Sequence, residues 1–136
     1  MRTKLILLLC LIKCGLHAQL IHLEPASSHD SSYYDIRKMN DGSIWLGGEY
    51  GILKKINKGN VSSIPYPNNG SHILKIIENE NVIYMACDKG TIYRLNKETG
   101  DAKVKVYKRF RKKCFYDMAI DNNGRILVCG GTSAIG

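Results

Sequence analysis

One segment recurs three times along this chain, and its recurrence constrains the fold more than any other feature. The copies lie at residues 41–55, 82–94 and 123–131, and each places a short apolar run beside turn residues such as asparagine and glycine. Successive copies are offset by about 40 residues, a length typical of a repeated unit built from one small sheet. Because one such unit cannot bury both of its faces alone, each copy must pack against the next.

Each copy is predicted to fold as short strands joined by tight turns. Asn-Asp-Gly at 40–42 and Asn-Asn-Gly at 122–124 indicate hairpins, because glycine and asparagine accept the positive φ that such turns require. No stretch has the period of an amphipathic helix, so no helix is expected. The predicted strands are 34–38, 43–47, 51–56 and 61–64 in the first copy, 72–77, 82–86, 91–95 and 102–107 in the second, and 116–120 and 125–129 in the third.

This pattern predicts an all-β fold, a partial β-propeller with two four-stranded blades and the start of a third. The expected blades are about 34–71, 72–115 and 116–136, preceded by an N-terminal strand and loop at 19–33. Closed propellers typically have about four to eight blades, so the chain is expected to be incomplete, or else a small protein that closes by oligomerising. The open apolar blade face is expected to bind the remaining blades or to cause self-association.

Residues 1–18 are predicted to be a secretory signal peptide. They combine a basic start at Arg2 and Lys4, an apolar run at 5–12 and a small residue, Ala18, at the cleavage point. A membrane anchor and a lipoprotein signal are the alternatives, but the apolar run is far shorter than the roughly 20 residues that cross a bilayer. The chain is therefore expected to have no membrane span and to be exported, to the periplasm or to the cell surface and extracellular space.

Charge and cysteine content exclude several classes of function. The net charge of +8 suits acidic surfaces, but no nucleic-acid module is present and no nucleic-acid partner is expected. Cys87, Cys114 and Cys129 lie beyond the predicted signal peptide, at spacings that match no metal motif. They are interpreted as buried thiols rather than a disulfide. No metal site and no cofactor are predicted.

The first copy, at 41–55, contains Asp-Gly, then an apolar-Trp-apolar strand, and then Gly-Gly-x-x-Gly. In this motif the repeat resembles the two-component regulator propeller repeat, which forms the periplasmic sensor halves of hybrid histidine kinases. The second copy departs from it, with Tyr84 in place of tryptophan and Ala-Cys at 86–87 in place of the glycine pair, whereas the third keeps glycines at 130–131. The resemblance covers about 34–136, and it implies an exported sensing or scaffold domain with carbohydrates as the usual ligand class.

A candidate binding face is predicted at the rim of the propeller channel. A basic segment joins the outer strand of the second blade to the inner strand of the third, and the links after two second strands are expected to face the same rim. These residues are predicted to bind a carbohydrate, another anionic ligand or an acidic partner; alternatively they are solvated charges and turn-forming residues. The candidates are Lys108, Arg109, Arg111, Lys112 and Lys113 in the basic segment, and Glu49, Tyr50, Asp88 and Lys89 in the links.

No catalytic residue is assigned. The four histidines are scattered, and no Gly-x-Ser-x-Gly motif occurs. Asp35 and Asp117 fall at equivalent positions of the repeat, but the alignment places Leu74 between them in the second copy. They are interpreted as strand-start residues that bond a neighbouring turn. The sequence therefore predicts a non-catalytic ligand-binding or partner-binding domain; the alternatives are the N-terminal part of a propeller enzyme acting on polysaccharide, or of a structural propeller at the surface.

Overall fold

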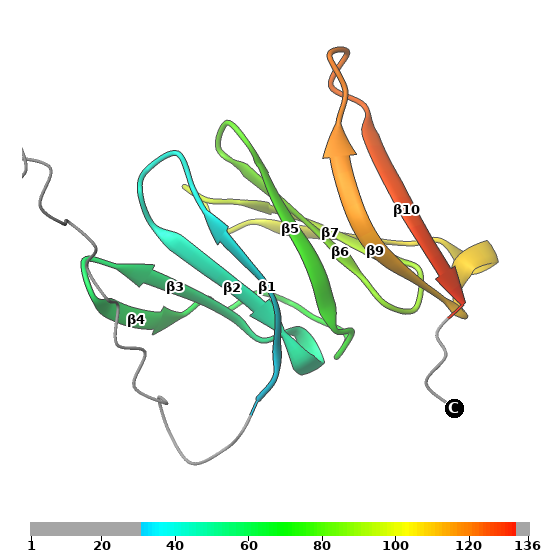
Figure 1. Ribbon diagram of the computed structural model, residues 1–136, viewed down its shortest axis with the longest axis horizontal. Helices are drawn as coiled ribbons and strands as arrows, with labels where there is room; N and C mark the ends of the chain where they lie inside the picture. The colour runs from blue at the N-terminus through cyan, green and yellow to red at the C-terminus, as the bar shows by residue number, and fades with distance from the viewer. Residues whose placement is uncertain (1–30, 133–136) are drawn as a thin grey trace, which may run out of the picture. The chain divides into compact units, whose positions relative to one another are not determined.

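Three antiparallel sheets account for most of residues 31–132, the part of the chain that the structure describes. In this computed structural model the strands of the first two sheets follow chain order, and the third sheet is a hairpin (Figure 1). The fold is all-β, as predicted. Within residues 31–132 no helix has the length and apolar character needed to cross a membrane. The predicted signal peptide lies outside the described residues.

The ten strands predicted from residue 34 onward are confirmed, with boundaries that shift by at most three residues. The N-terminal strand expected before them lies outside the described residues. The first sheet contains β1 (Tyr33–Lys38), β2 (Ile44–Gly48), β3 (Leu53–Asn57) and β4 (Asn60–Ser63). The second contains β5 (Ile73–Asn79), β6 (Val82–Cys87), β7 (Thr91–Asn96) and β8 (Ala102–Val106). The third contains β9 (Lys113–Ile120) and β10 (Ile126–Thr132). The expectation of no helix was wrong at two single 3₁₀ turns, η1 (Glu49–Gly51) and η2 (Lys108–Phe110), which are too short to need an amphipathic period.

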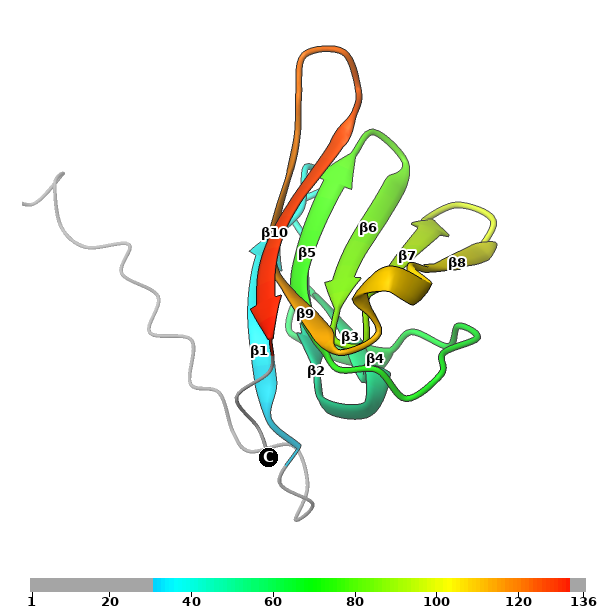
Figure 2. The same ribbon diagram turned by 90° about the vertical axis from the view of Figure 1, so that its right-hand side faces the viewer.

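The sheets pack face to face in series, with their first strands side by side. Figure 1 shows β1, β5 and β9 as neighbours, and β5 contacts both of the others. Figure 2 shows the second sheet splaying from β5 outward to β8. The second sheet therefore buries both faces, one against the first sheet and one against the β9–β10 hairpin.

The interface between the first and second sheets is the main hydrophobic core. Trp45 and Gly47 on β2 face Ile73 and Ile76 on β5, and both isoleucines are fully buried. A Cβ atom at Gly47 would lie 2.5 Å from Ile73 Cγ2, closer than real contacts allow. Glycine is required here because β5 approaches the backbone of β2 directly.

The interface between the second sheet and the hairpin repeats this arrangement. Ile77 and Ala86 of the second sheet pack against Phe115 and Met118 of β9 in a second buried cluster. Ala86 occupies the register position of Gly47, since each pairs with the residue that follows the bulge in its own first strand. A small residue on the second strand thus receives the next first strand at both interfaces.

The register corrects the alignment of the charged positions. In the structure Lys75, not Leu74, stands at the position of Asp35 and Asp117, because the β5–β6 turn is one residue shorter than the other two. Asp35 Oδ2 accepts a hydrogen bond of 2.7 Å from the backbone N–H of Ile76, and Lys75 Nζ lies 3.3 Å from Asp117 Oδ1. Both contacts join the first strands of adjacent sheets. The prediction that Asp35 and Asp117 bond a neighbouring turn was therefore wrong.

The cysteines are partly as predicted. Cys87, Cys114 and Cys129 are free thiols, and the first two are buried. Burial raises the pKa of the Cys87 thiol, so that it stays protonated at neutral pH. The expectation of a buried Cys129 was wrong, because none of the described residues covers that face of the hairpin.

A polar chain fixes the β1–β2 turn beneath the single tryptophan. Trp45 Nε1 donates to Ser43 Oγ over 3.1 Å, and Ser43 Oγ donates to Asp41 Oδ1 over 2.5 Å. The Ser43 hydrogen bonds, side chain first, lower the pKa of Asp41 to about 2, and Lys55 contributes from 3.3 Å. The ionised Asp41 carboxylate therefore holds the turn.

Replacement of Ile76 by alanine should destabilise the protein strongly. The side chain is fully buried between two sheets, and truncation there should lower the free energy of unfolding by about 2–5 kcal/mol. Ile36→Ala is the matched control, because Ile36 has the same register on β1 but is 59% exposed; its effect should stay within about 0.5 kcal/mol. Urea unfolding followed by circular dichroism measures both, and equal losses would contradict the described packing.

Acid should loosen the β1–β2 turn through Asp41. Its pKa in the folded chain lies below the ordinary 3.8, so its contribution to stability is complete above about pH 4 and is lost as the pH falls toward 2. In Asp41→Asn that decline should be smaller. Unfolding monitored by the fluorescence of Trp45, the only tryptophan, measures it. Glu80→Gln, which removes a negative charge from the β5–β6 turn, controls for net charge.

Candidate functional site

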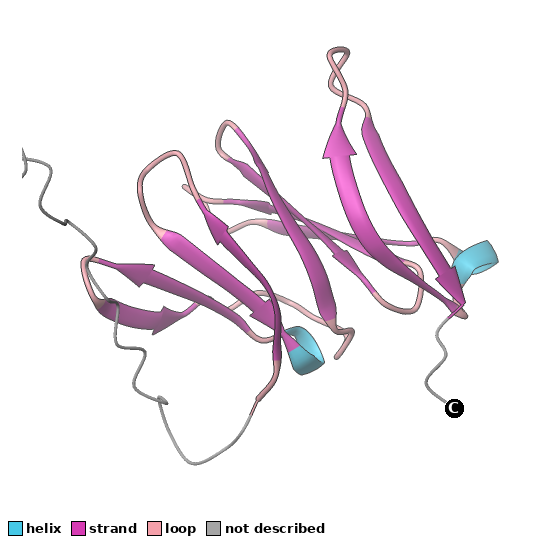
Figure 3. Ribbon diagram, in the orientation of Figure 1, coloured by secondary structure: helices cyan, strands magenta, loops and turns pink. Residues whose placement is uncertain are grey.

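The turns in which the sequence predicted a binding face lie together at one end of the strands, here called the candidate edge. The first strands β1, β5 and β9 begin at this edge, and β2, β6 and β10 end there. Figure 3 shows the two 3₁₀ turns, η1 after β2 and η2 before β9, at these strand ends. Because consecutive strands are antiparallel, residues far apart in the sequence meet along this edge.

At this edge three rings and two carboxylates form a cluster, here named the tyrosine–histidine cluster: Tyr34, Glu49, Tyr50, His72 and Asp88. The His72 ring lies 5.0 Å from the Tyr50 ring and 6.0 Å from the Tyr34 ring, centroid to centroid. Tyr50 is 68% exposed and Tyr34 is 48% exposed. The cluster thus presents aromatic faces to solvent, anchored from the first and second sheets together.

Hydrogen bonds fix the polar members of the cluster. Glu49 Oε2 accepts from the backbone N–H of Ser32 over 3.4 Å, and Glu49 Oε1 accepts from Tyr34 Oη over 3.2 Å. The Ser32 bond, chiefly, lowers the pKa of Glu49, whereas desolvation and the nearby Glu49 charge raise the pKa of Tyr34. At neutral pH Glu49 is therefore ionised and Tyr34 keeps its proton.

The histidine is held by backbone and side chain together. His72 Nδ1 accepts a hydrogen bond from the backbone N–H of Tyr50 over 3.3 Å. The backbone N–H of His72 donates to Asp88 Oδ1 over 2.9 Å, and His72 Nε2 lies 3.9 Å from Asp88 Oδ2. These contacts connect the η1 turn, the start of β5 and the β6–β7 turn. The ring is therefore placed by three segments that are distant in the sequence.

The backbone at Tyr50 is a repeated feature rather than a peculiarity of this cluster. Tyr50 has φ 51° and Lys89, its counterpart after β6, has φ 53°, and each precedes a glycine with positive φ. A Cβ atom at Gly90 would lie 2.6 Å from the Phe110 carbonyl oxygen, so η2 rests directly on this turn. The two turns share this backbone conformation, whereas the side chains at the position, tyrosine and lysine, differ.

The basic segment follows along the same edge. Gly90 N–H donates to the Lys113 carbonyl over 2.9 Å, and Gly90 accepts from Tyr107 N–H over 2.9 Å, which anchors both ends of the segment beside Asp88 and Lys89. Its members are Lys108, Arg109, Arg111, Lys112 and Lys113, of which the first four are exposed. The Lys113 ammonium donates to Thr132 Oγ1 over 2.7 Å instead of reaching solvent freely.

Two shallow grooves lie near these residues. The smaller, of about 240 Å³, is lined by Phe110, Lys113, Phe115, Val128, Gly130 and Gly131. The larger, of about 300 Å³, runs between the second sheet and the hairpin and is lined by Tyr84, Ile92, Arg94, Lys103, Val104, Lys105, Tyr107 and Ile126. Within residues 31–132 no group of three or more His, Cys, Asp or Glu side chains is arranged to hold a metal ion.

The structure brings the predicted rim residues onto one edge, although their binding role stays a prediction. The sequence missed Tyr34 and His72 as members of the cluster. Tyr34 was read only as a strand residue, yet it is the extra residue at a β-bulge that turns its side chain toward the rim. His72 carries no motif of its own, and its position as the first residue of the predicted strand 72–77 was the one available signal.

Comparison with known proteins identifies similar folds only among solved structures. No protein-family profile matches the sequence, and no curated protein matches it. The extracellular domain of the putative one component system BT4673 from B. thetaiotaomicron is 20% identical, with a TM-score of 0.61 over 73% of this chain. A second structure, described as the extracellular domain of the putative hybrid two component system BT4673, is 19% identical, with a TM-score of 0.62 over 76%. This chain spans 14% of the length of each.

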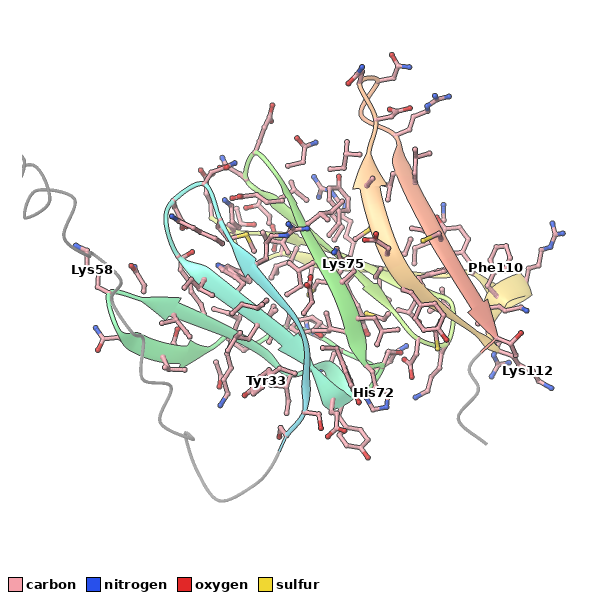
Figure 4. All side chains as sticks on the ribbon, in the orientation of Figure 1. Tyr33, Lys58, His72, Lys75, Phe110 and Lys112 are labelled. Carbon is pink, nitrogen blue, oxygen red and sulfur yellow. The ribbon has the colours of Figure 1, made fainter. Side chains whose placement is uncertain are left out.

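Charge reversal in the basic segment should weaken binding to polyanions. Arg111→Glu with Lys112→Glu changes two exposed cations on the candidate edge, so affinity for heparin should fall on the order of tenfold or more and depend less on salt. Lys54→Glu with Lys58→Glu is the control with the same charge change, since Lys58 lies at the opposite end of the described residues from Lys112 (Figure 4). Heparin chromatography and titration calorimetry measure the effect; equal losses in both variants would leave only net charge as the cause.

Proposed function

We propose that this chain is an exported, non-catalytic part of a sensor-type β-propeller that binds its ligand at the edge described above. The three successive sheets, with matched register and small residues at each interface, support assignment as two blades and the inner strands of a third. The likeness to two extracellular domains of a putative signalling protein supports an extracytoplasmic, sensor-like role.

The observation that carries the proposal is the tyrosine–histidine cluster. Tyr50 occupies a turn whose backbone conformation recurs after β6, so packing does not require an aromatic residue there. Lys89 fills the position equivalent to Tyr50. Exposed rings beside carboxyl groups suit sugars, because rings stack on apolar sugar faces and carboxyl oxygens accept hydroxyl hydrogen bonds.

We assign carbohydrate as the ligand class, with the basic segment as the partner for any acidic group on it. The β6–β7 turn joins the two features, since Asp88 contacts His72 and Gly90 contacts Lys113. An elongated ligand lying along the edge would meet rings and carboxylates first and cations next. Such an arrangement favours a saccharide chain over a compact metabolite.

The carboxylates at the inner strands support binding rather than hydrolysis. Asp35 accepts the Ile76 N–H and Asp117 faces Lys75, so each has a structural partner at a sheet interface. A glycosidase needs two carboxyl groups facing one bond of the substrate. The described residues offer no such pair on the candidate edge, where Glu49 and Asp88 are engaged by Ser32 and His72.

Binding to a panel of neutral and acidic oligosaccharides tests the proposal. We expect Tyr50→Ala to reduce affinity for any bound saccharide by about tenfold or more, because tyrosine is among the residue types whose truncation at the centre of a binding interface costs about 2 kcal/mol or more. Tyr33→Ala, which removes an exposed tyrosine outside the cluster, is the control. Calorimetry on the full chain measures both. A chain that binds no member of the panel, or that binds equally well in both variants, contradicts the proposed site.

A further inference from the structure

Each first strand carries two large apolar residues at matched register, and on β5 and β9 they are directed toward the preceding sheet. The pairs follow from strand pairing on either side of the bulge. On β5 and β9 both members are buried at an interface, whereas on β1 Tyr33 is 40% exposed and Ile36 is 59% exposed. The equivalent pairs are Ile73 with Ile76, Phe115 with Met118, and Tyr33 with Ile36.

The second strands carry the complementary feature. Gly47, Ala86 and Cys129 stand at one register position, each opposite the residue that follows the bulge. The first two receive the apolar pair of the next first strand, as the 2.5 Å approach of Ile73 to Gly47 illustrates. Cys129 is exposed, and Leu127, in the place of Trp45, is 53% exposed.

The polar contacts predict the same complementarity. At the first interface the Asp35 carboxylate accepts the N–H of Ile76. Asp117 occupies the place of Asp35 on the hairpin, and Ile36 occupies the place of Ile76 on β1. By register, Asp117 and the Ile36 N–H therefore stand on the open faces where the acceptor and the donor of this internal contact stand. Asp117 Oδ1 already accepts from the Met118 N–H and lies 3.3 Å from Lys75 Nζ, so the acceptor on the hairpin face is Asp117 Oδ2.

We propose that the open face of the β9–β10 hairpin binds the open face of the first sheet of a second copy of this chain. In that contact Tyr33 and Ile36 of one copy lie over Leu127 and Cys129 of another, in continuation of the two internal interfaces. The association is heterologous, because the two faces are different. Each copy added leaves one face of each kind free, so chains assemble head to tail.

Two face-blocking variants of the full chain test this. Ile36→Asp places a charge on the first face, and Cys129→Arg places a bulky charged group where only small residues fit; each site is exposed, so the fold should persist by circular dichroism. In sedimentation velocity the unmodified chain should show concentration-dependent species larger than a monomer. Each variant alone should associate at least about tenfold more weakly.

Mixing the two variants gives the decisive measurement. The intact hairpin face of Ile36→Asp meets the intact first-sheet face of Cys129→Arg, so an equimolar mixture should form a dimer and nothing larger. Val61→Asp, at a residue 51% exposed on β4, is the control and should associate like the unmodified chain. A monomeric unmodified chain, a mixture without dimers, or a Val61→Asp effect equal to that of Ile36→Asp would overturn the proposal.

Discussion

The close approach of each first strand to the second strand of the preceding sheet determines the rest of this structure. It requires a residue with little or no side chain on the second strand, and Gly47 and Ala86 provide it. That approach brings the isoleucines of β5 into the main core and places the Asp35 carboxylate within reach of a backbone N–H in the next sheet. Packing and polar contacts at the interfaces thus have one geometric cause.

The strand order was predictable from the sequence because turn residues and apolar runs are local signals. The register was not, because one missing residue in the β5–β6 turn shifts the alignment of everything before it. Lys75 rather than Leu74 then meets Asp117, and a supposed gap in a row of charges becomes an ion pair. Sequence periodicity detects a repeat unit, but it does not detect where a turn is shortened.

The candidate site likewise contains some residues that the sequence predicted and others that it did not. Glu49, Tyr50 and Asp88 could be named from the sequence because they fill turn positions that recur in the repeat. Tyr34 and His72 could not, since a β-bulge and a contact between two sheets bring them to the edge. Residues in turns are placed by local geometry, whereas residues recruited across an interface depend on packing that only the folded chain defines.

The same repeat explains why we place the proposed ligand site at the edge and the proposed association at the faces. A face position is constrained by its neighbour, so Gly47 and Ala86 stay small and their partners stay large. An edge turn is constrained only in its backbone, so Tyr50 and Lys89 adopt one conformation with unlike side chains. Change at the edge therefore alters what the surface binds at little cost to folding, whereas a large residue at Gly47 would separate two sheets. We therefore expect a ligand site on this fold at the turns, where the repeat fixes the backbone conformation but not the identity of the side chains.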